Sequence, residues 1–121
     1  MSENHLETLA QVVADRTRVL ILPHNDPDPD AIAAAVALRH LLELKFLVQS
    51  QIVYRGHIGR AENKAFARYL NKPLRRIRNI DLRSDLKIAL VDTQPGAGNN
   101  PLPENRRADV VIDHHNWRSA T

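Results

Sequence analysis

Residues 19–42 read VLILPHNDPDPDAIAAAVALRHLL and contain a strand signal followed directly by a helix signal. The apolar run Val19–Leu22 is typical of a strand that is buried on both faces of a sheet. Asp28 can cap the helix that follows, with Pro29 at its first position, where a helix needs no N–H group. Apolar residues then recur at helical spacing as far as about Leu44. The stretch therefore predicts a strand, a turn and a helix in direct succession.

The remainder of the chain alternates between the same two kinds of element. We expect two further helices, over Leu6–Ala14 and Ala61–Leu70, and four further strands, over Phe46–Tyr54, Ile77–Ile80, Leu86–Val91 and Asp109–Ile112. Gly56 and Gly59 mark one loop, and the proline- and glycine-rich residues Gln94–Glu104 mark another. Strands that alternate with helices predict an α/β fold with a mostly parallel sheet flanked by helices.

Composition limits both the class of protein and the kind of site. A chain of 121 residues with 43% hydrophobic residues can form one domain with a real core. The absence of cysteine excludes disulfides and thiolate ligands, so that only His and carboxylate oxygen could hold a metal. A formal charge of +3 weakly favours anionic partners. The chain shows neither a signal-peptide pattern nor a long apolar segment, and we expect a cytoplasmic protein without a membrane partner.

Acidic residues and histidines follow three of the expected strands. The strand that ends at Leu22 leads into His24, and the last two strands lead into Asp92 and Asp113. Ligands of open α/β sheets bind beyond the carboxyl ends of the strands, so we expect the clusters to converge on one edge of the sheet, at its carboxyl end. That edge would collect His24, Asp26, Asp28, Asp30, Asp92, Asp113, His114 and His115. Five close carboxylates repel one another unless protons or cations intervene, and mixed His and carboxylate ligands suit Mn²⁺, Zn²⁺ or Fe²⁺ better than Ca²⁺.

Simpler explanations exist for each cluster taken alone. An aspartate before a helix is usually a cap, one after a strand is usually a turn residue, and paired histidines in a loop usually lie on the surface. The coincidence of three clusters at equivalent positions favours a metal site. An EF-hand loop that starts at Asp26 is rejected, because its sixth and twelfth positions hold Ala31 and Ala37 instead of the glycine and glutamate it needs.

Three motifs make the chain resemble the DHH phosphoesterase superfamily. HNDPDPDAI (residues 24–32) resembles the first motif, a His followed by Pro-Asp-x-Asp at the start of a helix. Val91-Asp92-Thr93 resembles the second motif, and Asp113-His114-His115 is the motif that names the family. The family includes RecJ-type exonucleases, oligoribonucleases, cyclic-dinucleotide phosphodiesterases, exopolyphosphatases and manganese pyrophosphatases. The resemblance implies metal-dependent hydrolysis of a phosphoester or phosphoanhydride bond.

The resemblance also implies a set of metal ligands. His24 and Asp28 would hold one ion, Asp30 and His114 would hold a second ion, and Asp92 would bridge the two. The expected metal is Mn²⁺ at two sites of the complete domain, with Mg²⁺ or Co²⁺ as alternatives. Two such ions can share a water molecule, lower its pKa and aim it at phosphorus.

The family pattern gives the remaining motif residues other roles. Asp92, Asp113 and His115 would be the catalytic residues, with Asp113 orienting the neighbouring imidazole and His115 facing the substrate phosphate. Asp26 has no ligand role in the motif, and we expect it to support the ligands or to face solvent.

The chain departs from the family in two ways. Ala33-Ala34 replaces the usual Gly-Ser, which keeps small side chains but removes a hydroxyl group. We expect the family's fourth motif and its C-terminal substrate domain to lie beyond Thr121, so that residues 1–121 form the N-terminal part of a DHH catalytic domain. Alone, this part should bind one metal better than two and be a weak or inactive enzyme.

The sequence leaves several functions open. We expect the full protein to hydrolyse short RNA or DNA oligonucleotides or nucleotide phosphates, as a monomer or a homodimer. The alternatives are an exopolyphosphatase- or pyrophosphatase-like hydrolase and a noncatalytic module that binds metal or nucleotide. The loop and helix start at Gly56–Lys64 could hold a phosphate, gripped by Arg60, or could be an ordinary solvated loop. The basic residues Arg75, Arg76 and Arg78 could follow a nucleic-acid backbone or form a solvated face.

Overall fold

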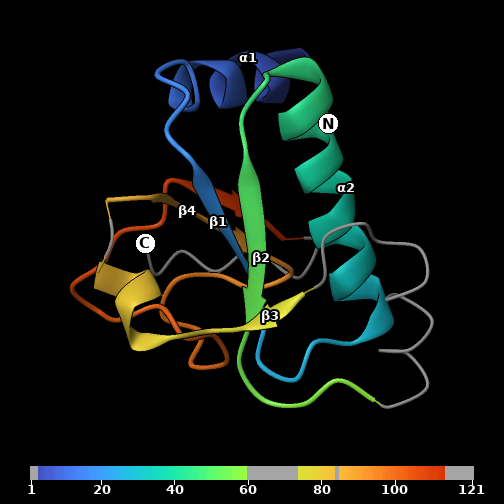
Figure 1. Ribbon diagram of the computed structural model, residues 1–121, viewed down its shortest axis with the longest axis vertical. Coiled ribbons are helices and arrows are strands. Elements are labelled where there is room, and N and C mark those ends of the chain that lie inside the picture. Colours follow the sequence, from blue (N-terminus) through green and yellow to red (C-terminus); the bar gives the residue numbers. More distant parts are fainter. Residues whose placement is uncertain (1–2, 60–73, 84, 114–121) are drawn as a thin grey trace.

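The computed structural model describes residues 3–59, 74–83 and 85–113, which form one sheet with helices packed around it (Figure 1). The elements are, in chain order, α1 (Glu3–Val12), β1 (Val19–Pro23), α2 (Pro29–Lys45), β2 (Ser50–Tyr54), β3 (Arg75–Arg76), the 3₁₀ helix η1 (Asn79–Arg83), β4 (Lys87–Val91) and β5 (Val110–Ile112). No helix within these described ranges has the length and apolar character that crossing a membrane requires.

The five strands form a parallel sheet in the order β3-β2-β1-β4-β5. The central strand β1 pairs with β2 on one side and with β4 on the other, so that Val19 lies opposite both Ser50 and Lys87. The first connection, through α2, places β2 on one side of β1, whereas β4 and β5 lie on the other side. The predicted α/β fold with a mostly parallel sheet is confirmed, and the strand order changes direction between β1 and β4.

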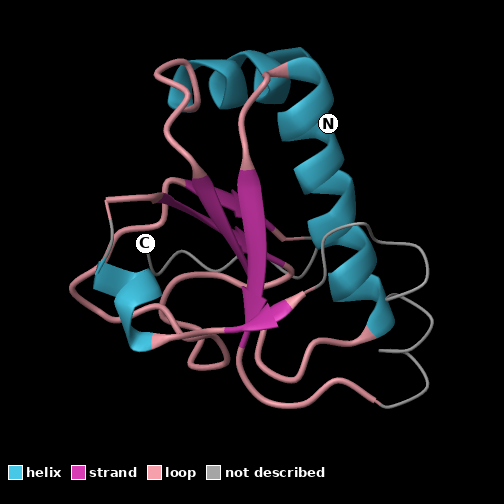
Figure 2. Ribbon diagram, viewed as in Figure 1, coloured by secondary structure: helices cyan, strands magenta, loops and turns pink. Residues whose placement is uncertain are grey.

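The strands β1 and β4 are buried on both faces of the sheet, which explains why they are continuous apolar runs. Alternate residues of β1 point to opposite faces, Val19 and Ile21 to one and Leu20 and Leu22 to the other. The first face packs against α1 and α2, whose buried side chains include Leu9, Ala35, Leu38 and Leu42. The second face is covered by residues of η1 and of irregular segments, namely Ile77, Leu82, Leu86, Leu102 and Ala108. Figure 2 shows α2 and η1 on opposite sides of the strands.

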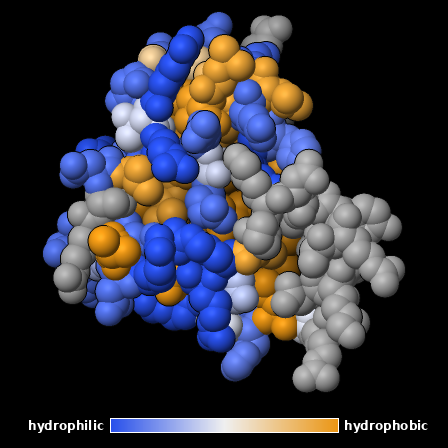
Figure 3. All heavy atoms as spheres, in the orientation of Figure 1, coloured by the Kyte–Doolittle hydropathy of each residue, from blue (hydrophilic) through white to orange (hydrophobic). Residues whose placement is uncertain are grey.

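The start of β2 lies later than the sequence predicts. The predicted strand Phe46–Tyr54 loses its first four residues because Phe46 caps α2 and Leu47 has a φ of 56°, which turns the chain. The N–H of Val48 donates back to the carbonyl of Leu42 and completes this turn. Figure 3 shows apolar atoms at the surface around this end of α2, where the Leu47 side chain is 66% exposed.

The strand predicted over Ile77–Ile80 is wrong. The structure has β3 at Arg75–Arg76 instead, followed by η1. The cause is the buried Asp81, whose carboxylate accepts two hydrogen bonds from the guanidinium of Arg75, at 2.7 and 2.8 Å, and one from the N–H of Arg78 at 2.6 Å. The bonds from Arg75 lower the pKa of Asp81 to about 2. This aspartate folds the segment back into a helical turn, and it gives two arginines of the basic run a partner within the protein.

Candidate metal centre

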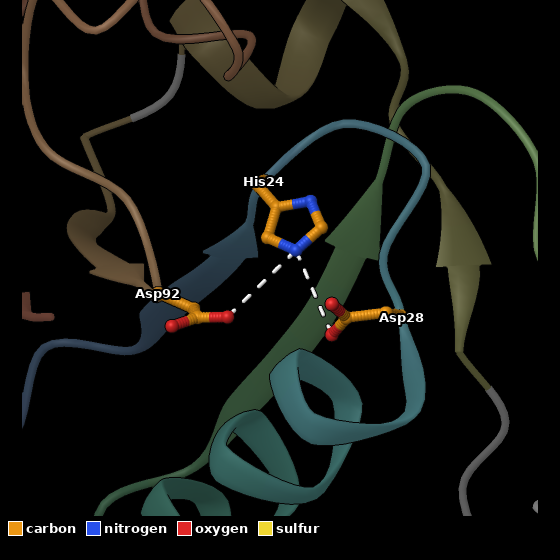
Figure 4. Close-up of side chains that lie close together, drawn as sticks. All are labelled: His24, Asp28 and Asp92. Carbon is orange, nitrogen blue, oxygen red and sulfur yellow. Dashed lines mark ion pairs between the residues drawn. The ribbon is translucent and has the colours of Figure 1, made fainter. Parts of the chain in front are cut away.

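The structure brings His24, Asp28 and Asp92 together at the carboxyl end of the sheet (Figure 4). One possible ligand atom from each residue lies within 4.8 Å of the other two. His24 follows β1, Asp92 follows the neighbouring strand β4, and Asp28 stands at the start of α2. In open α/β sheets the crevice for a ligand forms where the strand order changes direction, because the connections there lead away to opposite sides. The three residues line that position between β1 and β4.

The ring of His24 is oriented by its own neighbour in the chain. Its Nδ1 lies 2.8 Å from the carbonyl oxygen of Asn25. A carbonyl oxygen only accepts hydrogen bonds, so Nδ1 carries a proton and Nε2 is left to face the two carboxylates. A backbone carbonyl bound to one imidazole nitrogen is the usual arrangement when the other nitrogen is a metal ligand.

The spacing of the ligand atoms fits a single cation. Nε2 of His24 lies 3.7 Å from Oδ1 of Asp28 and 3.7 Å from Oδ2 of Asp92. These separations are too long for hydrogen bonds. Metal–ligand bonds of about 2.0–2.2 Å keep neighbouring ligands of one ion about 3.0–3.6 Å apart, close to the distances found here. One nitrogen and two carboxylate oxygens form a donor set suited to Mn²⁺, Fe²⁺ or Zn²⁺.

Asp28 caps α2 as well as facing His24. Its backbone is extended, and its Oδ1 accepts a hydrogen bond of 2.8 Å from the N–H of Ala31, with Pro29 in the first turn. The predicted cap is therefore confirmed. The positive end of the helix dipole favours a negative charge at this position. Because the Asp28 side chain is 56% exposed, the group is open to solvent on this side.

Asp92 is the buried member of the group, with 5% of its surface exposed. Its φ of 61° lies in the left-handed region, which aspartate tolerates better than most residues with a Cβ atom. Its N–H donates to the carbonyl of Ile112 at 2.7 Å, so that β5 helps to hold this turn. The left-handed backbone and this hydrogen bond together fix where the Asp92 side chain lies after β4.

The loop after β4, which the sequence predicts only as a loop, is hydrogen-bonded internally and supports the group. Thr93, which is buried, donates through Oγ1 to Oδ1 of Asn99 at 2.5 Å and accepts from Nδ2 of Asn100 at 3.0 Å. The carbonyl of Asn99 then accepts a bond of 2.6 Å from the N–H of Asn25. The loop after β4 is thereby joined to the loop that carries His24. The signal in the sequence was a threonine and two asparagines within a loop that begins at a strand end.

The other predicted site residues lie elsewhere or outside the described ranges. Asp30 is exposed in the first turn of α2 and does not join the group formed by the three described residues. Asp113 is half-buried beyond β5 and lines a cavity between α1 and β5. Arg60, His114 and His115 lie outside the described residues, as does the helix predicted over Ala61–Leu70. A second ion held by Asp30 and His114, and the roles of Asp113 and His115, stay predictions.

Comparison with known proteins identifies the family. The family model described as "DHH family, N-terminal domain" matches residues 18–121, and the chain therefore belongs to the DHH family. The members of this family are metal-dependent phosphoesterases. An uncharacterized protein of Methanocaldococcus jannaschii is 46% identical over 99 residues, which cover 81% of this chain and 20% of that protein. The chain thus spans about a fifth of the length of this curated relative. No solved structure matches the chain significantly.

Proposed function

We propose that this domain is the metal-binding part of a phosphoesterase that hydrolyses short oligonucleotides or nucleotide phosphates. The observation that carries the proposal is the convergence of His24, Asp28 and Asp92 at the change of strand order between β1 and β4. Membership of the DHH family supports the reaction class. The choice of nucleotide substrates follows from the family resemblance and from the mildly basic charge of +3, which favours anionic partners.

The residues of the group have distinct tasks in this proposal. His24, Asp28 and Asp92 would hold the first divalent cation, with His24 offering Nε2 because Nδ1 is bound to Asn25. The burial of Asp92 excludes water from one side of the group, which strengthens its attraction for a cation. When bound, divalent cations favour deprotonation of a water molecule and neutralise the charge that develops on a phosphoryl group.

The substrate would approach from the exposed side of the group. Asp28 is exposed there, at the N-cap of α2. A divalent cation held by the group would attract an anion such as a phosphate from this side. The substrate phosphate would lie over this side, with His115 facing it as the family pattern implies.

Calorimetric titration of Mn²⁺ tests the metal site directly. We expect Asp92→Asn to bind Mn²⁺ at least about tenfold more weakly than the wild-type chain, because a neutral amide replaces the buried carboxylate. Glu7→Gln is the matched control, since it makes the same charge change on the exposed side of α1 and should bind like the wild type. Equal affinity of Asp92→Asn and the wild type would contradict the proposal.

A substrate screen tests the reaction. The full-length protein with Mn²⁺ is offered a dinucleotide, a nucleoside bisphosphate, pyrophosphate and polyphosphate, and phosphate or nucleotide release is measured. Hydrolysis of the first two substrates is the expected result. Hydrolysis restricted to pyrophosphate or polyphosphate would replace the nucleotide substrates with phosphoanhydrides. Metal binding without turnover of any substrate would indicate a noncatalytic module.

A further inference from the structure

We propose that Asp26 and Gly56 are positioning residues for the metal centre. They form a contact, called here the Asp26 clasp, between the loop that carries His24 and Asp28 and the segment that follows β2. The inference rests on the proposed function, because it concerns how two of the three metal-binding residues are held in place. Asp26 itself is not a ligand in this inference, and it acts through the residues on either side of it.

Two hydrogen bonds form the Asp26 clasp. The N–H of Asp26 donates to the carbonyl of Arg55 at 2.9 Å. Oδ1 of Asp26 accepts from the N–H of His57 at 2.7 Å. The midpoint of the loop is therefore attached to the segment at the end of β2. On its other side the same loop is attached through Asn25 to the carbonyl of Asn99, as described above.

The backbone of Asp26 makes the contact possible. Its φ of 52° lies in the left-handed region, which aspartate and asparagine tolerate better than other residues with a Cβ atom. This conformation turns the chain between His24 and Asp28, which are four residues apart in the sequence and face each other across 3.7 Å. A residue that disfavours the left-handed region would work against this turn.

Gly56 is complementary to Asp26. A Cβ atom built on Gly56 would lie 2.0 Å from Oδ1 of Asp26 and 2.9 Å from its backbone nitrogen. Both distances are far below ordinary van der Waals contact, and the φ of Gly56 is 95°, in the region that favours glycine. Only glycine therefore lets the two segments approach so closely, and the sequence signal of a loop glycine acquires a specific role.

The effect of the clasp on metal binding follows from its place in the chain. Asp26 lies two residues from His24 on one side and two residues from Asp28 on the other. If the midpoint of the loop is released, both side chains gain alternative positions, and binding an ion must restrict them again. Residues that orient metal ligands typically change metal affinity by about 10–100-fold when they are removed.

The test compares two substitutions of Asp26 in the chain, with Mn²⁺ as the probe. Asp26→Ala removes the acceptor and disfavours the left-handed backbone, and we expect Mn²⁺ affinity to fall by about 10–100-fold. Asp26→Asn keeps an oxygen acceptor and the backbone preference while removing the charge, and we expect affinity within about threefold of the wild type. Rescue by asparagine separates positioning from a direct role of the carboxylate.

Amide hydrogen exchange without metal provides a second measurement. In Asp26→Ala the amide of His57 should exchange faster, whereas the amides of β1 and β4 should keep their protection and show that the sheet is folded. Gly56→Ala should weaken Mn²⁺ binding in the same way. If Gly56→Ala does not fold, the comparison of Asp26→Ala with Asp26→Asn alone tests the clasp.

Each other outcome has a distinct meaning. Wild-type affinity in Asp26→Ala would overturn the clasp and leave the proposed metal site intact. Loss of affinity in Asp26→Asn equal to that in Asp26→Ala would also overturn it, because the charge and not the contact would then matter. A wild-type chain that binds no Mn²⁺ would overturn the proposed function and the clasp together.

Discussion

The carboxylate oxygen of Asp28 that caps α2 is the same oxygen that lies 3.7 Å from Nε2 of His24. One side chain therefore fixes where the helix begins and offers a possible metal ligand. The two roles use different properties of the group, because capping needs only an acceptor whereas cation binding gains from the full negative charge. A substitution that removes the charge and keeps the acceptor can separate them.

Asp28→Asn should lose metal affinity while keeping stability. Asparagine caps helices about as well as aspartate, so we expect a free energy of unfolding within about 0.5 kcal/mol of the wild type, measured in urea with a chelator present. Mn²⁺ affinity should fall at least about tenfold. Asp28→Ala is the comparison, and it should lose about 1 kcal/mol of stability as well as affinity. Wild-type Mn²⁺ affinity in Asp28→Asn would contradict a ligand role.

The hydroxyl group of Thr93 should be important for the loop after β4. Thr93→Val keeps the shape of the side chain but leaves Asn99 and Asn100 without their shared buried partner. We expect a loss of about 1–3 kcal/mol in the free energy of unfolding and faster exchange of the Asn25 amide. Thr93→Ser retains the hydroxyl and should lose less. Equal losses in the two variants would assign the effect to packing.

The ion pair between Asp81 and Arg75 should make stability depend on pH in acid. The folded-state pKa of Asp81 is lowered to about 2, mainly by the hydrogen bond from Arg75, whereas the unfolded value is near 3.9. Because the folded pKa is the lower one, the stabilisation is complete above about pH 4 and is lost as the pH falls through about 2.

Asp81→Asn isolates this contribution. We expect the variant to be less stable than the wild type by about 1–3 kcal/mol at about pH 7, and the difference should shrink as the pH falls below about 4. Urea unfolding of both proteins over this range measures the difference, and other acid-sensitive groups, such as Asp15, largely cancel in it. A difference that stays constant with pH would refute the contribution of the ion pair.

A glycine at position 47 should stabilise the protein. Leu47 adopts a φ of 56° just after α2, and its side chain is largely exposed, so it contributes little packing. Leu47→Gly relieves the left-handed strain, and we expect a gain of about 0.5–1 kcal/mol in thermal or urea unfolding. Leu44→Gly is the control, because Leu44 is also largely exposed but lies within the helix, where glycine should cost about 1 kcal/mol. Destabilisation by Leu47→Gly would show that the leucine side chain contributes more than its exposure indicates.

The strong local signals of the sequence predicted β1, α2 and β4, and with them the expectation that His24, Asp28 and Asp92 lie at one edge of the sheet. The apolar runs of β1 and β4 mark buried parallel strands, and the carboxyl ends of parallel strands share one edge of a sheet. The nearness of His24 and Asp92 follows from these two facts once β1 and β4 are neighbours. The strand order itself could not be read from the sequence, because it depends on which side of β1 each connection takes.

The remaining differences arise from contacts between segments. Nothing in the local pattern of Ile77–Ile80 indicates that Asp81 binds Arg75 and turns the chain into η1. The loop contacts of Thr93 and Asp26 depend in the same way on which loops the fold brings together. Short polar side chains in loops have many potential partners, and only the complete fold selects among them.

The pairing of β1 with β4 also determines when the metal centre can form. These strands are neighbours in the sheet but lie far apart in the sequence, and such distant pairings form slowly because a long loop must close first. We expect His24 and Asp92 to meet late in folding, once β4 has paired with the central strand β1. A cation that needs both residues would stabilise the native state more than the folding transition state. We expect such an ion to slow unfolding while leaving the rate of folding almost unchanged. The ion would therefore increase the kinetic stability of the folded domain.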